Sequence, residues 1–373
     1  MNMMIYIVML AFVLVCVSFQ GRYHDNFVYK EESNNHIINY KIPLVYITSF
    51  MFFSALLLLS IMRAPEVGTD GIMYYKFFWY GNFEVYFDPL INFIYTYSIQ
   101  NNEYSYFIYI TSFLFVSVSF YTILRLDFPK WVLIFYFISS YYYLISFNVV
   151  RQSIAISIVF LAVSVIYNSK KLNLKMITLF IVLIVVASGF HNSAILTLSF
   201  LVFRFLKLNH FILLSGFMLI TIGYFSSFIK SIIQPIFRYF EFYTLKYGAG
   251  SSFFIMEEGS KGFTEFLPIF VQYIFLYIGY TLYINKQKDV AGTYILNYYF
   301  IFLILYAFSG IEAIDRFQYY FYPSIILFYA WIFKRSYSSG KYTYFNYFTI
   351  VFWVLYYLLR LIGNKHGVVP YLI

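Results

Sequence analysis

Residues 131–167 read WVLIFYFISSYYYLISFNVVRQSIAISIVFLAVSVIY, and Arg151 is the only charged residue among them. The apolar runs on either side of it, 131–147 and 153–167, are typical of helices that cross a bilayer. The rest of the chain follows the same pattern, because 62% of the 373 residues are hydrophobic and only 11% are charged, about half the charged fraction of a soluble domain. The sequence therefore predicts an all-α, polytopic integral membrane protein and excludes a soluble globular domain.

Charges and clusters of Pro, Gly or Asn divide the chain into about twelve predicted spans, which we interpret as a single transmembrane domain over residues 1–373. The first run could be a signal peptide, but it has no basic n-region and no small-x-small cleavage site, so we interpret it as a span. The spans other than the two above are 4–19, 42–62, 107–124, 176–189, 193–203, 211–229, 266–284, 295–308, 319–333 and 344–361.

The positive charges predict the orientation of these spans. Alternate short loops hold 12 of the 25 Lys and Arg residues, which places those loops in the cytoplasm. The N-terminus is then outside, and residues 63–106 form a first outer loop in which 87–99 is an interfacial or re-entrant helix. A second long outer loop covers 230–265, as a lid or glycan contact or as a tolerated surface loop. The basic loops are 125–130, 170–175, 204–207, 286–288 and 334–341.

Charge and cysteine content exclude other classes. A formal charge of +9 in a membrane protein reflects loop anchoring, so nucleic acid is not an expected partner. The single cysteine, Cys16, excludes disulfides and thiolate metal clusters. The chain has no Asp-x-Asp motif, no Gly-rich phosphate loop and no zinc-protease motif, so we expect no metal and no cofactor.

Three isolated arginines lie on the predicted outer side, at the mouths of spans: Arg63, Arg151 and Arg316. Such residues usually face a polar cavity or an anionic ligand, and guanidinium matches phosphate oxygens. Alternatively, each reaches a lipid headgroup or pairs with a nearby acid such as Asp70 or Asp315. Helix N-terminal amides near Arg151 would reinforce anion binding, so the three together predict an outward-facing anion site.

Four ordered stretches carry these residues: RAPEVGTDGIMYY at 63–75, FNVVRQSIA at 147–155, FHNSA at 190–194 and IDRFQYYFYP at 314–323. In this order and at these separations they resemble the EpsG-type branch of the Wzy polysaccharide polymerases, over roughly residues 4–333. The resemblance implies a GT-C-type glycosyltransferase in the bacterial inner membrane, with its active site facing the periplasm or outside.

Members of that family are thought to transfer a growing glycan from undecaprenyl pyrophosphate to the non-reducing end of a lipid-linked repeat unit. The products implied are O-antigen for lipopolysaccharide, or capsule and exopolysaccharide in relatives. The expected partners are undecaprenyl-pyrophosphate-linked oligosaccharides and membrane lipid, with a chain-length regulator and a flippase implied by the resemblance alone.

This chemistry assigns roles to the candidate residues. Arginines would bind the pyrophosphate and stabilise charge as the glycosidic bond breaks, and a base would accept the proton of the attacking hydroxyl. The tyrosines could bind sugar, although an interfacial aromatic belt would also explain them. The predicted catalytic residues are His191, Asp70 and Arg151, and the predicted pyrophosphate or glycan contacts are Arg63, Arg151, Gln152, Arg316, Tyr74 and Tyr320.

Two other functions remain open at this point. A ligase that moves finished glycan to another acceptor would use the same donor and similar arginines. A flippase for lipid-linked oligosaccharide would also bind pyrophosphate, but it should show internal repeats, and the sequence shows none.

Overall fold

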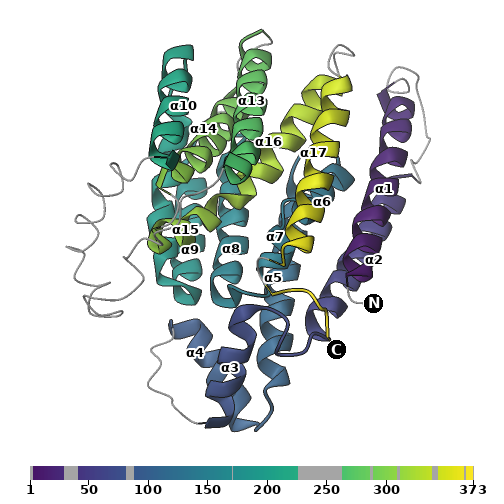
Figure 1. The fold of residues 1–373 in the computed structure, drawn as a ribbon, viewed down its shortest axis with the longest axis vertical. Coiled ribbons are helices and arrows are strands. Elements are labelled where there is room, and N and C mark those ends of the chain that lie inside the picture. Colours follow the sequence, from purple (N-terminus) through teal and green to yellow (C-terminus); the bar gives the residue numbers. More distant parts are fainter. Residues whose placement is uncertain are drawn as a thin grey trace, which may run out of the picture. The chain divides into compact units, whose positions relative to one another are not determined.

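The computed structural model describes residues 3–28, 41–80, 88–169, 171–225, 263–285, 289–308, 311–337, 343–364 and 367–372 (Figure 1). Every regular element within these ranges is a helix, which confirms the all-α class. The chain divides into two compact units. Unit 1 comprises Met1–Ile166, Asn173–Leu198 and Tyr329–Ile373, and unit 2 comprises Tyr167–Leu172 and Ser199–Phe328.

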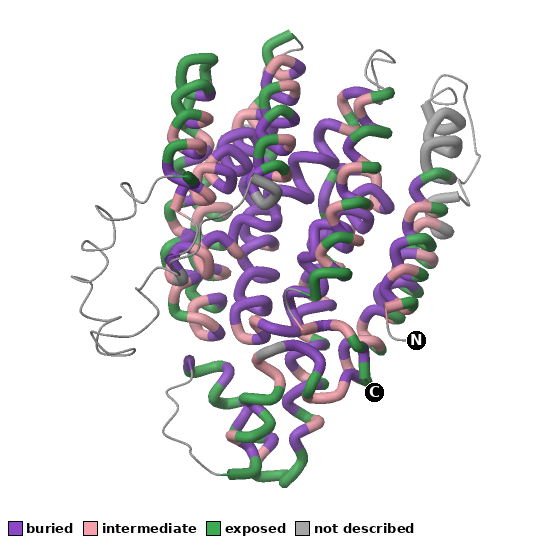
Figure 2. The backbone as a smooth tube through the Cα atoms, in the orientation of Figure 1, coloured by how far each residue is buried: buried purple, intermediate pink, exposed green. Residues whose placement is uncertain are grey.

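Helix α8 (Val150–Ile166) forms the centre of unit 1. It packs against α5 (Ser105–Arg125) and α9 (Leu174–Phe190), and nearly all of its side chains are buried (Figure 2). Apart from Arg151 and Gln152 in its first turn and three serines, α8 is apolar on every face, which is typical of a helix inside a bundle. By contrast, α9 exposes Val182 and Val185, as expected of a helix with one face toward lipid. Unit 1 also contains α1 (Met4–Val28), α2 (Lys41–Ile61) and α17 (Thr343–Ile362).

Unit 2 is built around α10 (His210–Phe225), α13 (Phe263–Asn285) and α14 (Val290–Leu305), which contact one another. The 3₁₀ turn η3 (Tyr306–Phe308) follows α14 and packs on α10. Helix α15 (Glu312–Gln318) and the 3₁₀ turn η4 (Tyr319–Phe321) lead into α16 (Tyr322–Tyr337), whose last residues belong to unit 1.

The membrane character of the chain is supported, but the number of spans is not. Among the described residues, four helical segments are long and apolar enough to cross a membrane: Ser105–Arg125, Phe266–Asn285, Val290–Phe308 and Tyr344–Ile362. Shorter apolar helices occupy other predicted spans. The prediction of twelve spans is therefore not confirmed.

One predicted span, 131–147, is a broken helix. Helix α6 (Lys130–Ser139) ends at a serine pair, Tyr141 adopts a left-handed conformation with φ 72°, and α7 (Tyr142–Ile145) follows. The whole break is buried in protein, and irregular backbone at membrane depth is tolerated under that condition. Hydropathy alone could not detect the break, because apolar residues continue through it.

The short predicted span 193–203 is a 3₁₀ helix, η1 (Asn192–Arg204). A 3₁₀ helix rises about 2.0 Å per residue, so its 13 residues reach about 26 Å, further than an α-helix of equal length.

The two predicted outer loops have different outcomes. Within 63–106 the structure contains two helices, α3 (Thr69–Tyr80), which was not predicted, and α4 (Pro89–Gln100), at the place of the predicted interfacial helix 87–99. Of the predicted loop 230–265, residues 230–262 lie outside the described residues. Its last three residues are helical, because α13 begins at Phe263.

Connections that are distant in sequence meet at the ends of unit 1. Helices α3 and α4 lie together at one end of the unit, where α8 begins and α9 ends (Figure 1). Two loops predicted to be cytoplasmic, 125–130 and 334–341, are joined by an ion pair between Lys334 Nζ and Asp127 Oδ2 at 2.8 Å. The side of the membrane on which each end lies stays a prediction.

Gly68 lies in the turn between α2 and α3. It packs against Phe147 and Asn148, the residues that precede α8. Its φ is +95°, and a Cβ there would lie 2.4 Å from the Phe147 carbonyl oxygen. We expect Gly68→Ala to cost roughly 1–3 kcal/mol of stability, because both the backbone conformation and the space exclude a side chain. The measurement is the thermal unfolding midpoint of the purified protein.

Gly363→Ala provides the control for this prediction, since its nearest contact would be 3.3 Å away and its φ is not positive. Equal midpoints for the two variants would contradict the prediction.

Candidate active site

Arg151, the second residue of α8, is held by side chains from two other segments of unit 1. Its Nε donates a hydrogen bond to the Tyr74 hydroxyl at 2.8 Å. Its Nη1 lies 3.5 Å from Asp88 Oδ2, and the side chains of this ion pair are 17% and 2% exposed respectively. The guanidinium is thus fixed in orientation at the N-terminus of α8 while part of it still reaches solvent.

Asp88 connects Arg151 to a third segment. It precedes Pro89 at the start of α4, and its Oδ1 accepts a hydrogen bond of 3.3 Å from the backbone N–H of Asn192. One buried carboxylate therefore bridges the start of α8 and the junction between α9 and η1. Asp88 was not among the predicted site residues, although it is the second residue of the predicted interfacial helix 87–99. The available signal was an acid directly before a proline that opens an apolar helix.

His191 lies at that junction. It caps the C-terminus of α9, where its N–H bonds the Ala187 carbonyl at 3.1 Å. Its Nδ1 is 2.7 Å from the Ser193 hydroxyl, which orients the ring. In the tautomer in which Nδ1 donates to Ser193, Nε2 is the nitrogen able to accept a proton. The structure therefore brings the segments of Arg151 and His191 together through Asp88. An anion site at this place stays a prediction.

Tyr74 is buried beneath Arg151 and is 1% exposed. Its ring packs on Phe107 with centroids 5.1 Å apart. Burial raises the pKa of Tyr74 to about 12 against the opposing charge of Arg151, so the phenol stays neutral and can accept the arginine N–H. Asp70, one turn earlier on α3, is half-buried, and its negative charge also raises the pKa of Tyr74. Tyr74 as a sugar contact stays a prediction, and the observed contact of its hydroxyl is with Arg151.

Arg63 follows α2 and is 8% exposed. Its guanidinium carbon lies 4.6 Å from the centroid of the Phe147 ring, four residues before Arg151. Within the described part of the chain, no carboxylate lies at ion-pair distance from Arg63. Its electrostatic neighbours are instead neutral phenols, Tyr6, Tyr104, Tyr143 and Tyr371. Arg63 is therefore a nearly buried cation whose charge the described residues do not neutralise by an ion pair.

Chain segments that are distant in sequence form the surroundings of Arg63. Tyr6 of α1 donates to the Val368 carbonyl at 2.9 Å, and Tyr371 donates to the Leu59 carbonyl at 2.5 Å. The N–H of Ala64 bonds the Leu372 carbonyl at 2.9 Å. The C-terminal segment therefore fixes the turn that carries Arg63.

The remaining predicted residues fall into two groups. Gln152 is buried beside Arg151 in α8. Arg316 and Tyr320 belong to unit 2, where Arg316 is half-buried near the end of α15 and Tyr320 is buried in η4. The Tyr320 carbonyl accepts a hydrogen bond of 2.6 Å from the Tyr298 hydroxyl. The convergence of Arg316 with Arg63 and Arg151 stays a prediction, as does a sugar contact by Tyr320.

The chemistry of this end of unit 1 suits an anion. Arg63 lies against Phe147, Arg151 bonds Tyr74, and His191 bonds Ser193, so this unit holds two guanidinium groups, one imidazole and several hydroxyls. Among the described residues, no group of three or more His, Cys, Asp or Glu side chains could hold a metal ion.

Comparison with known proteins gives one match. The model of the EpsG family matches residues 44–373, a range that includes every predicted site residue. No curated protein and no solved structure matches the chain.

Proposed function

The chain belongs to the EpsG family, and from this premise we propose that it is a polysaccharide polymerase, a membrane glycosyltransferase that joins repeat units. In this proposal the donor is a growing glycan on undecaprenyl pyrophosphate, and the acceptor is the non-reducing end of a lipid-linked repeat unit. The reaction takes place at the outer face of the bacterial inner membrane, within a GT-C-type fold.

The observation that carries the proposal is the fixed guanidinium of Arg151 at the N-terminus of α8. In the transfer, the acceptor hydroxyl oxygen attacks the anomeric carbon, and the bond from that carbon to the pyrophosphate oxygen breaks. Negative charge then develops on the leaving pyrophosphate, where oriented donors lower the barrier most. Arg151 provides such a donor, and the charge of Arg63 adds to it.

The attacking hydroxyl must lose its proton, and His191 is the residue that we assign as base. Its ring is oriented by the Ser193 hydroxyl at 2.7 Å, and its loop is tied to Arg151 through Asp88. Asp70 is the second choice. Asp88 itself is a poor base, because its charge is already balanced by Arg151.

The test is the length of glycan on cells that express His191→Ala or Arg316→Ala at the protein level of the wild type. We expect loss of the long-chain ladder with a single repeat unit retained, because chain extension fails while flipping and ligation continue. The matched control is Arg125→Ala. Arg125 is exposed at the end of α5, so this variant should leave the ladder intact.

Each other outcome has a definite meaning. Loss of even the single repeat unit would indicate a flippase or a ligase instead of a polymerase. Unchanged ladders would show that His191 and Arg316 are interfacial residues outside the reaction.

A further inference from the structure

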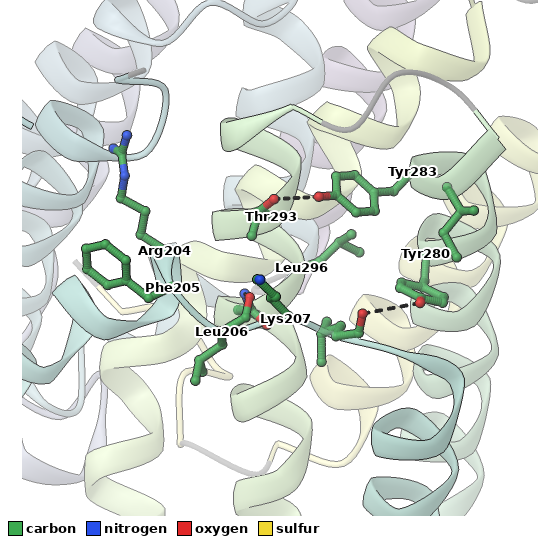
Figure 3. A pocket seen from close by; sticks show the side chains of 11 residues that line it. Arg204, Phe205, Leu206, Lys207, Tyr280, Tyr283, Thr293 and Leu296 are labelled. Atoms are coloured by element: carbon green, nitrogen blue, oxygen red, sulfur yellow. Dashed lines mark hydrogen bonds between the residues drawn. The ribbon is translucent and has the colours of Figure 1, made fainter. Parts of the chain in front are cut away.

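Unit 2 contains a cavity that the polymerase chemistry does not use. Its volume is about 530 Å³, within the range of small-molecule sites. Figure 3 shows the segment from Arg204 to Lys207 on one side and residues from α13 and α14, Tyr280, Tyr283 and Thr293, on the other.

The polar part of the cavity combines two cations with hydroxyl groups. Arg204 is half-buried and Lys207 is exposed. Opposite them, the Tyr283 and Thr293 hydroxyls bond each other at 2.6 Å, and Tyr280 donates to the Leu208 carbonyl at 3.2 Å. The two cations provide the hydrogen-bond donors that phosphate oxygens require. The three hydroxyl groups already donate within the protein, Tyr280 to the Leu208 carbonyl, Tyr283 to Thr293 and Thr293 to the Asp289 carbonyl, so toward a ligand they act as acceptors.

The segment that carries the two cations is anchored to α14. The Nδ2 of buried Asn297 donates to the Phe203 and Leu206 carbonyls at 2.7 and 2.9 Å. The carboxylate of Asp289 is engaged in capping α14, where it accepts the Gly292 N–H at 2.7 Å, and it is not a lining residue. The described lining of the cavity is therefore positively charged.

Apolar groups lie beside these cations. Phe205 is 69% exposed, and Leu206 and Ile284 are also exposed at the rim. Exposed aromatic and aliphatic side chains next to basic residues are typical of a membrane–water interface. The loop 204–207 belongs to the set that the charge pattern places in the cytoplasm, where anionic lipid headgroups give the membrane surface its negative charge.

We propose that this cavity binds the phosphate headgroup of an anionic phospholipid from the cytoplasmic leaflet. Arg204 and Lys207 contact the phosphodiester, the hydroxyl oxygens of the Tyr283–Thr293 pair accept hydrogen bonds from the rest of the headgroup, and the acyl chains lie along Phe205 and Leu206. The inference uses the predicted orientation of the chain but not the polymerase reaction, so the two proposals can fail separately.

The test measures phosphatidylglycerol binding to the full-length protein in detergent, by native mass spectrometry over a lipid titration. We expect Arg204→Gln/Lys207→Gln to bind the lipid about thirtyfold more weakly, because each basic residue contributes about fivefold near an anionic surface. The control variant Lys171→Gln/Lys175→Gln removes the same charge from another predicted cytoplasmic loop and should bind like the wild type. Arg204→Lys, which keeps the charge, should retain most of the affinity.

Three results would overturn the proposal. Equal weakening in the control variant would indicate non-specific attraction, and equal affinity for phosphatidylcholine would show that the anionic headgroup is not recognised. Displacement of the lipid by millimolar inorganic phosphate would identify a site for soluble phosphate instead of a lipid. Because the readout is bound lipid, glycan polymerisation by these variants does not enter the test.

Discussion

Replacing Arg151 with alanine is expected to remove the long-chain glycan ladder and to leave a single repeat unit on the acceptor. The guanidinium is oriented by contacts to Tyr74 at 2.8 Å and to Asp88 at 3.5 Å, and alanine has no donor to put in its place. Removal of one fixed donor to a developing oxyanion costs about 10²–10³ in rate. The rate of chain extension, measured on purified lipid-linked repeat units, should fall by that factor.

Two further variants separate charge from geometry at this position. Arg151→Lys keeps the charge, but one ammonium cannot reproduce the planar fork that meets Tyr74 and Asp88 together, so we expect an intermediate rate. Tyr74→Phe keeps Arg151 and removes a single hydrogen bond, so its loss should be smaller than that of Arg151→Ala. The exposed Arg125 again supplies the control. A normal ladder in Arg151→Ala would place the pyrophosphate site elsewhere.

Sequence patterns predicted the features that depend on local chemistry. Helix α4 lies at the place of the predicted interfacial helix 87–99. A lone arginine at a span boundary pointed to Arg151, whose guanidinium is held by Tyr74, while the anion site itself stays a prediction. The link through Asp88 depends instead on tertiary contact. Its partners Arg151 and Asn192 are 63 and 104 residues away in the chain, and no periodicity relates them.

The surroundings of Arg63 could not be predicted for a similar reason. The bond from Tyr6 to Val368 joins residues 362 positions apart, and the chain contains 43 tyrosines, so composition gives no means of selecting those few. The break at Tyr141 was hidden as well, because burial by neighbouring helices permits it and the apolar pattern continues through it. Hydropathy predicts whether a segment lies in water or in the membrane. These features depend instead on which segments contact one another in the folded chain.

Asp88→Ala is expected to destabilise the protein strongly and to stop polymerisation with it. The substitution leaves Arg151, whose side chain is 17% exposed, without its carboxylate, and it removes the acceptor of the Asn192 N–H. Breaking a buried ion pair from one side costs about 3–5 kcal/mol, because the remaining charge is desolvated without compensation. The thermal unfolding midpoint should fall in both single variants, because Arg151→Ala in turn leaves Asp88, which is 2% exposed, without its cation.

The double variant Asp88→Ala/Arg151→Ala decides whether the ion pair is the cause. If it is, removing the second charge restores part of the stability lost in Asp88→Ala, while the ladder stays absent because no guanidinium remains. Asp88→Asn adds a further separation, since its amide oxygen can still accept the Asn192 N–H and hold the His191 loop, although it no longer balances Arg151. Additive losses in the double variant would contradict this explanation. They would show that Asp88 stabilises α4 and the α9–η1 junction without acting through Arg151. The Asp88 contacts would then have no role in orienting Arg151.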